Sequence, residues 1–138
     1  MNRLQTYYGT SIGKKIVVAI TGVIMYGFVI GHMLGNLKAF GGATALDQYA
    51  EDPRTIGHAF LVYGTFLWIA RIVLIGAVIG HVTTVILLGK INSSSQPTRT
   101  VRRRNASTLA AKWMAVSGTL ILLFIIIHIA QFTLGWIT

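Results

Sequence analysis

The hydrophobic pattern of the chain consists of three long apolar runs separated by two polar segments. The runs cover about Lys15–Leu37, about Phe60–Leu88 and about Trp113–Trp136. Each exceeds the roughly 18 apolar residues that a helix needs to cross a bilayer. The first run is rich in glycine and lacks a small-residue cleavage site, which favours a membrane helix over a removable signal peptide. The pattern predicts an all-α integral membrane bundle of three transmembrane helices, in a single domain over residues 1–138.

The two polar segments differ in character. The first, Gly41–Gly57, allows a short helix over Ala43–Glu51. The second, over about residues 89–112, contains a serine-rich stretch and the arginine run Arg102–Arg104. It predicts a basic surface loop without a core of its own.

The basic residues lie mainly on one side of the predicted membrane. The chain has twelve Lys and Arg against three Asp and Glu, a net charge of +9. Nine of the twelve lie before or at the start of the first run, or between the second and third runs. The positive-inside rule therefore predicts a cytoplasmic N-terminus and a cytoplasmic loop over residues 89–112. Nucleic-acid binding is disfavoured, because the Arg102–Arg104 run has no interleaved aromatic residues and lies between two spans.

The chain contains no cysteine. This excludes a disulfide framework, cysteine-ligated iron–sulfur or zinc sites, and the C-x-x-C-H attachment of covalent haem. Any metal cofactor inside the membrane would therefore depend on histidine.

Three histidines lie deep inside the apolar runs. The sequence VIGH ends at His32 and again at His81, and the third run contains His128. At about 1.5 Å per residue, His32 and His128 lie about 25 Å and about 24 Å from the inner ends of their runs, so they share a level. His81 lies about 13 Å from the inner end of its run, roughly 11 Å nearer the cytoplasm.

Two imidazoles at one level suit an octahedral metal that already has four in-plane ligands, as haem iron does. Axial ligation by His32 and His128 would leave the iron to carry electrons, and His81 would bind a second haem with a ligand not visible in this chain. The alternatives are histidines that cross-link helices by hydrogen bonds or that serve a proton path. Zinc is disfavoured, because carboxylate or cysteine ligands at a matching depth are missing.

Further residues beside the histidines fit the haem interpretation. Gly31 and Gly80 would clear space for a flat cofactor, although such glycines also serve helix packing. Arg71 is the only basic residue inside an apolar run, and the runs contain no acidic side chain to pair with it. A haem propionate is its predicted partner. The alternative is that Arg71 reaches the interface or a lipid head group.

Four stretches carry a resemblance to a known family. They are Ser11-Ile12-Gly13-Lys14-Lys15 with Thr21-Gly22, His32 through Gly35-Asn36-Leu37, Trp68-Ile69-Ala70-Arg71-Ile72 leading to His81, and Trp113 through Gly118 leading to His128. Together they resemble the cytochrome b membrane anchor of succinate dehydrogenase, in the di-haem type that builds the whole anchor from one polypeptide. The resemblance covers nearly the whole chain, and the settings of the histidines are its most specific part.

The resemblance implies how the ligands are divided. His32 and His128, on the first and third helices, would ligate the haem distal from the soluble subunits, and His81 would ligate the proximal haem. The family has five transmembrane helices and its fourth supplies the second proximal ligand, whereas this sequence reaches Thr138 after three. The sequence is then a fragment, or another membrane chain supplies further helices, or the anchor holds one haem and His81 is not a ligand.

The resemblance also implies a function and partners. The chain would be a multi-pass protein that anchors a flavoprotein subunit, which carries FAD, and an iron–sulfur subunit to the bacterial cytoplasmic membrane. Electrons would pass from the iron–sulfur clusters through haem b to a quinone, expected to be menaquinone, in the respiratory chain and the tricarboxylic acid cycle. The chain itself performs no succinate chemistry, and the complex could run as a succinate dehydrogenase or a fumarate reductase.

A quinone site needs hydrogen-bond donors and a proton source beside an apolar slot. No single sequence motif identifies one here. The candidates are Asp47, Glu51 and His58 on the outer side and Tyr8, Ser11, Lys14 and Trp113 on the inner side.

A different functional class remains open. The chain could be a three-helix structural or assembly subunit of a membrane complex without haem, in which the histidines only bridge helices. A small transporter is less favoured, because the apolar runs contain no carboxylate that could couple proton or cation movement.

Overall fold

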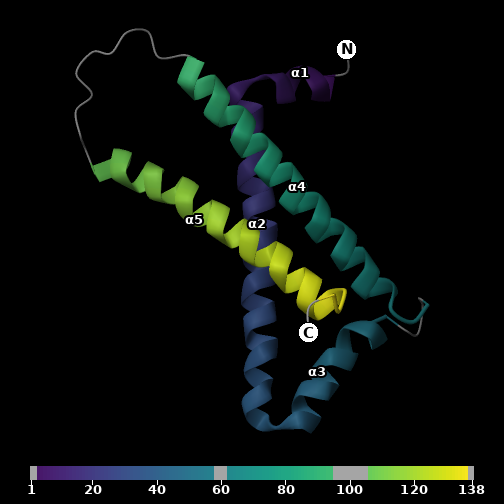
Figure 1. Ribbon diagram of the computed structural model, residues 1–138. Coiled ribbons are helices and arrows are strands. Elements are labelled where there is room, and N and C mark those ends of the chain that lie inside the picture. The colour runs from purple at the N-terminus through teal and green to yellow at the C-terminus, as the bar shows by residue number, and fades with distance from the viewer. Residues whose placement is uncertain (1–2, 58–61, 95–105, 137–138) are drawn as a thin grey trace. The chain divides into compact units, whose positions relative to one another are not determined.

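The computed structural model describes residues 3–57, 62–94 and 106–136, and within these ranges the chain is helical and contains no strand. The predicted all-α class is confirmed. The elements are α1 (Arg3–Gly9), α2 (Ser11–Asn36), the 3-10 helix η1 (Leu37–Gly41), α3 (Ala43–Thr55), α4 (Thr65–Ser94), α5 (Ala106–His128) and the π-helical turn η2 (Ile129–Thr133). Figure 1 shows the long helices α2, α4 and α5 and the shorter helices α1 and α3.

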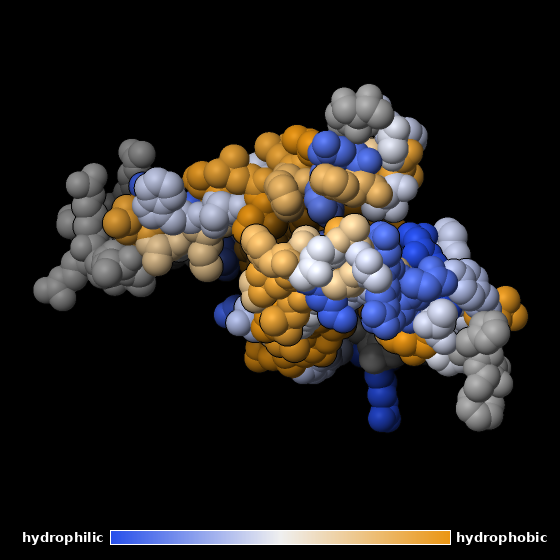
Figure 2. Space-filling view, turned by 90° about the horizontal axis from the view of Figure 1, so that it is seen from below, coloured by the Kyte–Doolittle hydropathy of each residue, from blue (hydrophilic) through white to orange (hydrophobic). Residues whose placement is uncertain are grey.

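Three segments of the described chain are long and apolar enough to cross a membrane: Ser11–Gly41, Thr65–Asn92 and Lys112–Thr133. The three predicted transmembrane helices are therefore confirmed. Most of their large apolar side chains are exposed, and hydrophobic residues (orange) cover much of the surface in Figure 2. Surfaces of this kind are stable when lipid rather than water surrounds them.

The helices extend further into the polar segments than the hydrophobic pattern predicts. The prediction assigned residues 89–112 to a loop, but α4 continues to Ser94 and α5 begins at Ala106. A helix satisfies its backbone hydrogen bonds internally, so it can continue past the apolar core into the head-group region. Residues 95–105, with the arginine run, lie outside the described ranges. The short helix predicted over Ala43–Glu51 is confirmed as α3, which extends to Thr55.

The described chain divides into two units, Met1–Gln96 and Pro97–Thr138. The first unit contains α1 to α4, and the second contains α5 and η2. Each unit is described by itself below. The single domain over residues 1–138 remains a prediction.

A sharp corner joins α1 to α2. Thr10 has an extended backbone and caps α2, because its hydroxyl oxygen accepts a hydrogen bond from the Gly13 N–H at 3.0 Å. The same hydroxyl donates to the Tyr7 carbonyl at 2.7 Å and so joins the end of α1 to the start of α2. The hydrophobic pattern did not predict α1, because this seven-residue helix lies outside the apolar runs.

Lys14 holds α1 against α2. Its side chain is only 7% exposed, and Nζ donates hydrogen bonds of 2.9 Å to the Tyr8 and Gly9 carbonyls. These carbonyls belong to the last turn of α1, where a helix lacks intrahelical donors. The ammonium group also lies 5.3 Å from the centre of the Tyr8 ring. A buried lysine is thus satisfied by capping a helix C-terminus.

The main helix contact of the first unit is between α2 and α4. The two helices run antiparallel, lie close together near α1 and separate toward α3 (Figure 1). On α4, Ala77 and Thr84 are buried, and half-buried residues continue that face at spacings of three and four. At the end near α1, the Tyr8 hydroxyl lies 3.0 Å from Thr84 Oγ1. This polar contact ties α1 to α4 across α2.

The C-terminal end of α2 turns back into α3 through η1. Gly42 has a φ of +95°, a conformation that favours glycine, and there the chain enters α3. Gly35 of α2 is buried beneath the Tyr49 ring of α3, so tightly that a Cβ at Gly35 would overlap that ring. The Lys38 ammonium lies 5.8 Å from the centre of the same ring. Tyr49 therefore fixes the position of α3 against α2.

Candidate functional site

His81 lies where α2 and α4 are in contact. The half-buried imidazole is 3.0 Å from the Thr21 hydroxyl, measured from Nδ1 to Oγ1. A Cβ built on Gly22 would lie 3.5 Å from His81 Cε1, and one built on Gly80 would lie 3.8 Å from the Thr21 methyl group. Both are ordinary van der Waals distances, so Gly22 and Gly80 lie at the contact of the two helices, where the imidazole crosses between them.

The contact with Thr21 defines the level of His81 along α2. Thr21 precedes His32 by eleven residues, which corresponds to a rise of about 16 Å along a helix. His81 and His32 therefore occupy different levels of the first unit. The level predicted to be shared by His32 and His128 involves both units, so it stays a prediction.

His32 faces the same side of α2 as Met25 and Gly35. It is half-buried, whereas the preceding four residues are exposed. Its ring stacks on Phe28, with the ring centres 5.1 Å apart and the planes 17° from parallel. Phe28 is one turn below His32 on the helix and restricts the rotation of the imidazole.

His128 has a similar setting in the second unit. Its ring is half-buried and stacks on Phe124, with ring centres 5.5 Å apart and an interplanar angle of 25°. Phe132 contacts it from the other side, with ring centres 4.9 Å apart. The helix changes to the π-helical turn η2 directly after His128, and such turns are frequent at functional sites.

His32 and His128 therefore share a local motif that His81 lacks. Each has a phenylalanine four residues earlier that stacks on its ring, whereas His81 has the buried Ala77 at that position and a hydroxyl from another helix beside it. The F-x-x-x-H spacing is visible in the sequence, and the sequence analysis missed it. Thr21, by contrast, is 60 residues from His81 along the chain, and no local spacing indicates it.

Arg71 lies in the N-terminal part of α4, ten residues before His81. Its guanidinium lies 5.2 Å from the centre of the Trp68 ring on the same helix. Arg71 is half-buried. The haem propionate remains its predicted partner.

The glycines named in the sequence analysis have different surroundings. A Cβ on Gly31 would meet nothing within 4 Å, and the same is true of Gly27 and Gly76. Gly80, in contrast, faces the Thr21 methyl group. Gly31 therefore leaves open space beside His32, while Gly80 contributes to the contact of α2 with α4.

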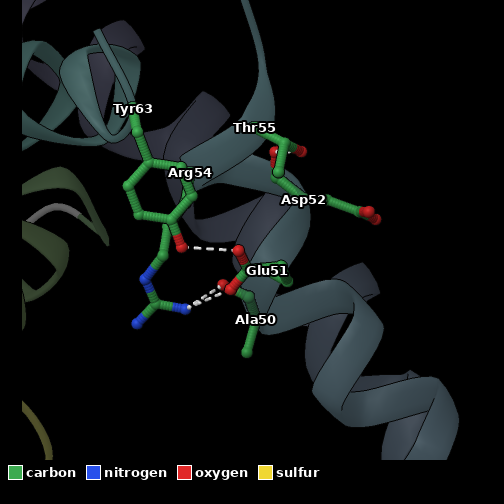
Figure 3. A network of polar contacts seen from close by, with 6 residues as sticks. All are labelled: Ala50, Glu51, Asp52, Arg54, Thr55 and Tyr63. Carbon is green, nitrogen blue, oxygen red and sulfur yellow. Dashed lines mark hydrogen bonds and ion pairs between the residues drawn. The ribbon is translucent and has the colours of Figure 1, made fainter. Parts of the chain in front are cut away.

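A polar network joins α3 to the segment just before α4 (Figure 3). The Tyr63 hydroxyl donates to Glu51 Oε1 at 2.5 Å, and Arg54 Nη1 lies 3.5 Å from Glu51 Oε2. Arg54 also donates to the Ala50 carbonyl at 2.6 Å. Because the Arg54 and Glu51 side chains are well exposed, their ion pair contributes little to stability. The network positions Glu51, one of the predicted outer quinone-site residues, against a tyrosine.

The hydrogen bond to Glu51 raises the pKa of Tyr63 above its ordinary value of 10.0, because the phenolate would lose the bond. Reduced hydration and the Glu51 charge raise it further, while Arg54 lowers it.

We expect Glu51→Gln to lower the Tyr63 pKa, as measured by titrating phenolate absorbance with Tyr63→Phe as the reference. The stabilising contribution of the bond is complete below pH 10 and is lost as the pH rises through the Tyr63 pKa.

Asp52→Asn is the matched control for this titration. Asp52 is the acid next to Glu51, and Thr55 and Ile56 donate hydrogen bonds to its backbone carbonyl, which the substitution leaves in place. An unchanged Tyr63 titration in Glu51→Gln would contradict the assigned cause.

The remaining quinone-site candidates are dispersed. Tyr8 and Lys14 contact each other at the α1–α2 corner, and Ser11 lies beside them in the first turn of α2. Trp113 belongs to the second unit, and His58 lies outside the described residues. Asp47 is exposed on α3, four residues before Glu51. The structure thus brings together two of these candidates, Tyr8 and Lys14. It also brings Glu51 together with Tyr63, a residue that was not among the predicted quinone-site candidates.

The histidine settings fit haem ligation by the chemistry of the donor set. A haem iron takes one imidazole on each face, and each of the three histidines is half-buried on a span and held by a neighbouring ring or hydroxyl. Metal-binding histidines have such supporting contacts, which fix the orientation of the ring. Within the part of the chain that the structure describes, no three His, Cys, Asp or Glu side chains form a metal-binding group.

Comparisons with protein-family models, with curated proteins and with solved structures found no match to this chain.

Proposed function

We propose that this chain is a membrane cytochrome b subunit that anchors succinate dehydrogenase and carries electrons from an iron–sulfur subunit to a quinone. The observation that carries the proposal is the set of three intramembrane histidines, each half-buried and each with a side chain that orients its ring. Two of them share the phenylalanine motif and one has a different setting. This division parallels the predicted one between an outer haem at His32 and His128 and an inner haem at His81.

The residues of the chain would hold two redox groups at separate levels. Haem, when bound, supplies one-electron transfer at its iron. Thr21, the residue of α2 that contacts His81, is about 16 Å from His32 along α2, which is a continuous helix between these two positions. Phe28 and Phe124 would shield the imidazoles of His32 and His128 from water and fix their planes.

A charge inside a span supports the same proposal. Arg71 is half-buried within a span, where a positive charge needs an anion or a route to water. An anionic group of the cofactor bound beside Arg71 would neutralise the guanidinium and hold the cofactor in one orientation.

The remaining parts of the proposal come from the resemblance of the sequence. The partners would be a flavoprotein with FAD, an iron–sulfur subunit and, for the second ligand of the inner haem, a further membrane chain or segment. The acceptor would be menaquinone, and the location the bacterial cytoplasmic membrane. The basic residues at the predicted inner side would contact the iron–sulfur subunit.

A second candidate is a structural subunit in which histidines only bridge helices. The hydrogen bond between His81 and Thr21 favours this candidate, because it joins α4 to α2 without a cofactor. The two candidates differ in a simple property, since a scaffold without haem purifies colourless.

The test is a reduced-minus-oxidised optical spectrum and a pyridine-haemochrome count of the chain with the subunits that co-purify with it. We expect a b-type spectrum in the wild type and the loss of one haem in His81→Ala. The matched control is Ala77→Ser, a small change one turn away on the same face of α4. A colourless wild-type complex would exclude the cytochrome and favour the scaffold.

A further inference from the structure

The Thr21 hydroxyl is placed between its own helix and His81. Oγ1 is 2.7 Å from the Val17 carbonyl, 3.2 Å from the Val18 carbonyl and 3.0 Å from His81 Nδ1. Thr21 is itself half-buried at the contact between α2 and α4. One hydroxyl therefore meets two carbonyl acceptors on one side and an imidazole on the other.

The short bond to Val17 determines the direction of the bond to His81. A hydroxyl has one hydrogen, and threonine in a helix commonly donates it to the carbonyl four residues earlier. A lone pair of Thr21 Oγ1 then faces His81, so Nδ1 must carry the hydrogen of that bond. The opposite assignment would break the 2.7 Å bond and place a hydrogen on Nε2, for which the described residues provide no acceptor.

We propose that Thr21 is a positioning residue for His81: its hydroxyl accepts the Nδ1–H hydrogen bond and so leaves Nε2 as the nitrogen that ligates the haem iron. This inference rests on the proposed haem function. A metal-ligating histidine commonly donates its other ring N–H to an oxygen acceptor, which sets the tautomer and the ring plane. Here the acceptor comes from a different helix, so the docking of α2 against α4 determines the orientation of the ligand.

Two glycines lie beside the contact of Thr21 with His81. A Cβ at Gly22 would be in ordinary contact with the imidazole, and a larger side chain would displace it from Thr21. A Cβ at Gly80 would likewise be in ordinary contact with the Thr21 methyl group. The hydroxyl and the imidazole thus meet at 3.0 Å where small residues of both helices surround them.

Loss of the hydroxyl should weaken ligation by His81. Thr21→Val keeps the branched shape and removes only the acceptor, which leaves Nδ1–H unpaired and the ring free to rotate. Supporting contacts of this kind typically contribute about 10–100-fold in metal affinity. The hydrogen bond makes Nε2 a stronger donor and so favours ferric over ferrous iron. A tenfold greater loss of ferric than of ferrous affinity would raise the midpoint potential by about 59 mV.

The experiment compares three variants of the chain in its purified complex. Thr21→Val removes the acceptor and Thr21→Ser retains it. Thr119→Val is the matched control, because Thr119 on α5 makes the same kind of bond, to the Ala115 carbonyl at 2.9 Å, but is exposed. We expect Thr21→Val alone to lose haem at the His81 level at least tenfold more readily and to shift its potential upward. The haem at His32 and His128 should keep its potential in every variant.

A second readout does not depend on bound haem. Nitrogen-15 NMR of histidine-labelled chain should show hydrogen on Nδ1 of His81 in the wild type and in Thr21→Ser, and a changed pattern in Thr21→Val. Unchanged haem content and potential in Thr21→Val would overturn the positioning role while leaving the cytochrome intact. A wild type that contains no haem would overturn the cytochrome and this role together. His81 with hydrogen on Nε2 in the wild type would overturn the assigned direction of the bond.

Discussion

Replacing His32 or His128 with alanine is expected to remove the same single haem, and the double variant is expected to lose no more than either single variant. This outcome follows if the two imidazoles ligate opposite faces of one iron, because removing either one breaks the site. The pyridine-haemochrome count of the purified complex measures the loss directly. The expected decrease is one haem for each of the three variants, with the haem at His81 retained.

The phenylalanine motif provides the controls for this prediction. Phe28→Leu and Phe124→Leu leave the ligands in place and remove only the stacked rings, so each should keep the haem and broaden its spectrum or shift its potential. If His32→Ala and His128→Ala remove haem independently, so that the double variant loses two, then each histidine serves a separate site. The pairing at a shared level would then be wrong, although the proposal of a cytochrome would stand.

Gly13→Ala is expected to detach α1 from the start of α2. A Cβ at this position would lie 2.1 Å from the Tyr7 carbonyl oxygen and 2.8 Å from its carbon. Both atoms belong to the backbone, so the clash is relieved only if α1 moves away. Overpacking of this kind typically costs about 1–3 kcal/mol, and here the movement would also break the capping bonds from Lys14 and the contact of Tyr8 with Thr84.

Hydrogen exchange of the α1 amides together with detergent unfolding would measure this effect. We expect faster exchange over Arg3–Gly9 and lower stability in Gly13→Ala. Gly27→Ala is the matched control, because it lies in the same helix and its added Cβ would meet nothing within 4 Å. It should leave the stability nearly unchanged. Equal exchange of α1 in the two variants would show that the close contact at Gly13 does not hold α1.

Hydropathy along the chain was sufficient to predict the spans and the short helix that follows the first of them. A membrane imposes a length and an apolar composition on each crossing segment, and both can be counted in a sequence. The ends of the helices were less well predicted. Ser94 and Ala106 lie in the polar segment that was assigned to a loop, because a helix can extend past the apolar core that hydropathy detects. The helix α1 was missed because Gly13, Thr10 and Lys14 hold it through contacts rather than through any periodicity of its own.

The candidate site shows the same division. The sequence shows that His32, His81 and His128 lie inside apolar runs, and it shows the phenylalanine four residues before two of them. The sequence does not show the partner of His81, because Thr21 lies 60 residues away along the chain. Since α4 is apolar on nearly all sides, its pattern does not indicate which face contacts α2.

The sequence by itself therefore determined an all-α chain with three membrane-spanning helices and a histidine within each. Contact with lipid requires apolar residues along the whole length of a span, and these can be counted in the sequence. Only the tertiary structure decided that Thr21 faces His81, that Lys14 caps α1 and that Tyr63 binds Glu51. Each of these contacts depends on how two segments dock. Docking is set by close packing at small residues such as Gly13 and Gly35, whose effect appears only when both partners are in place.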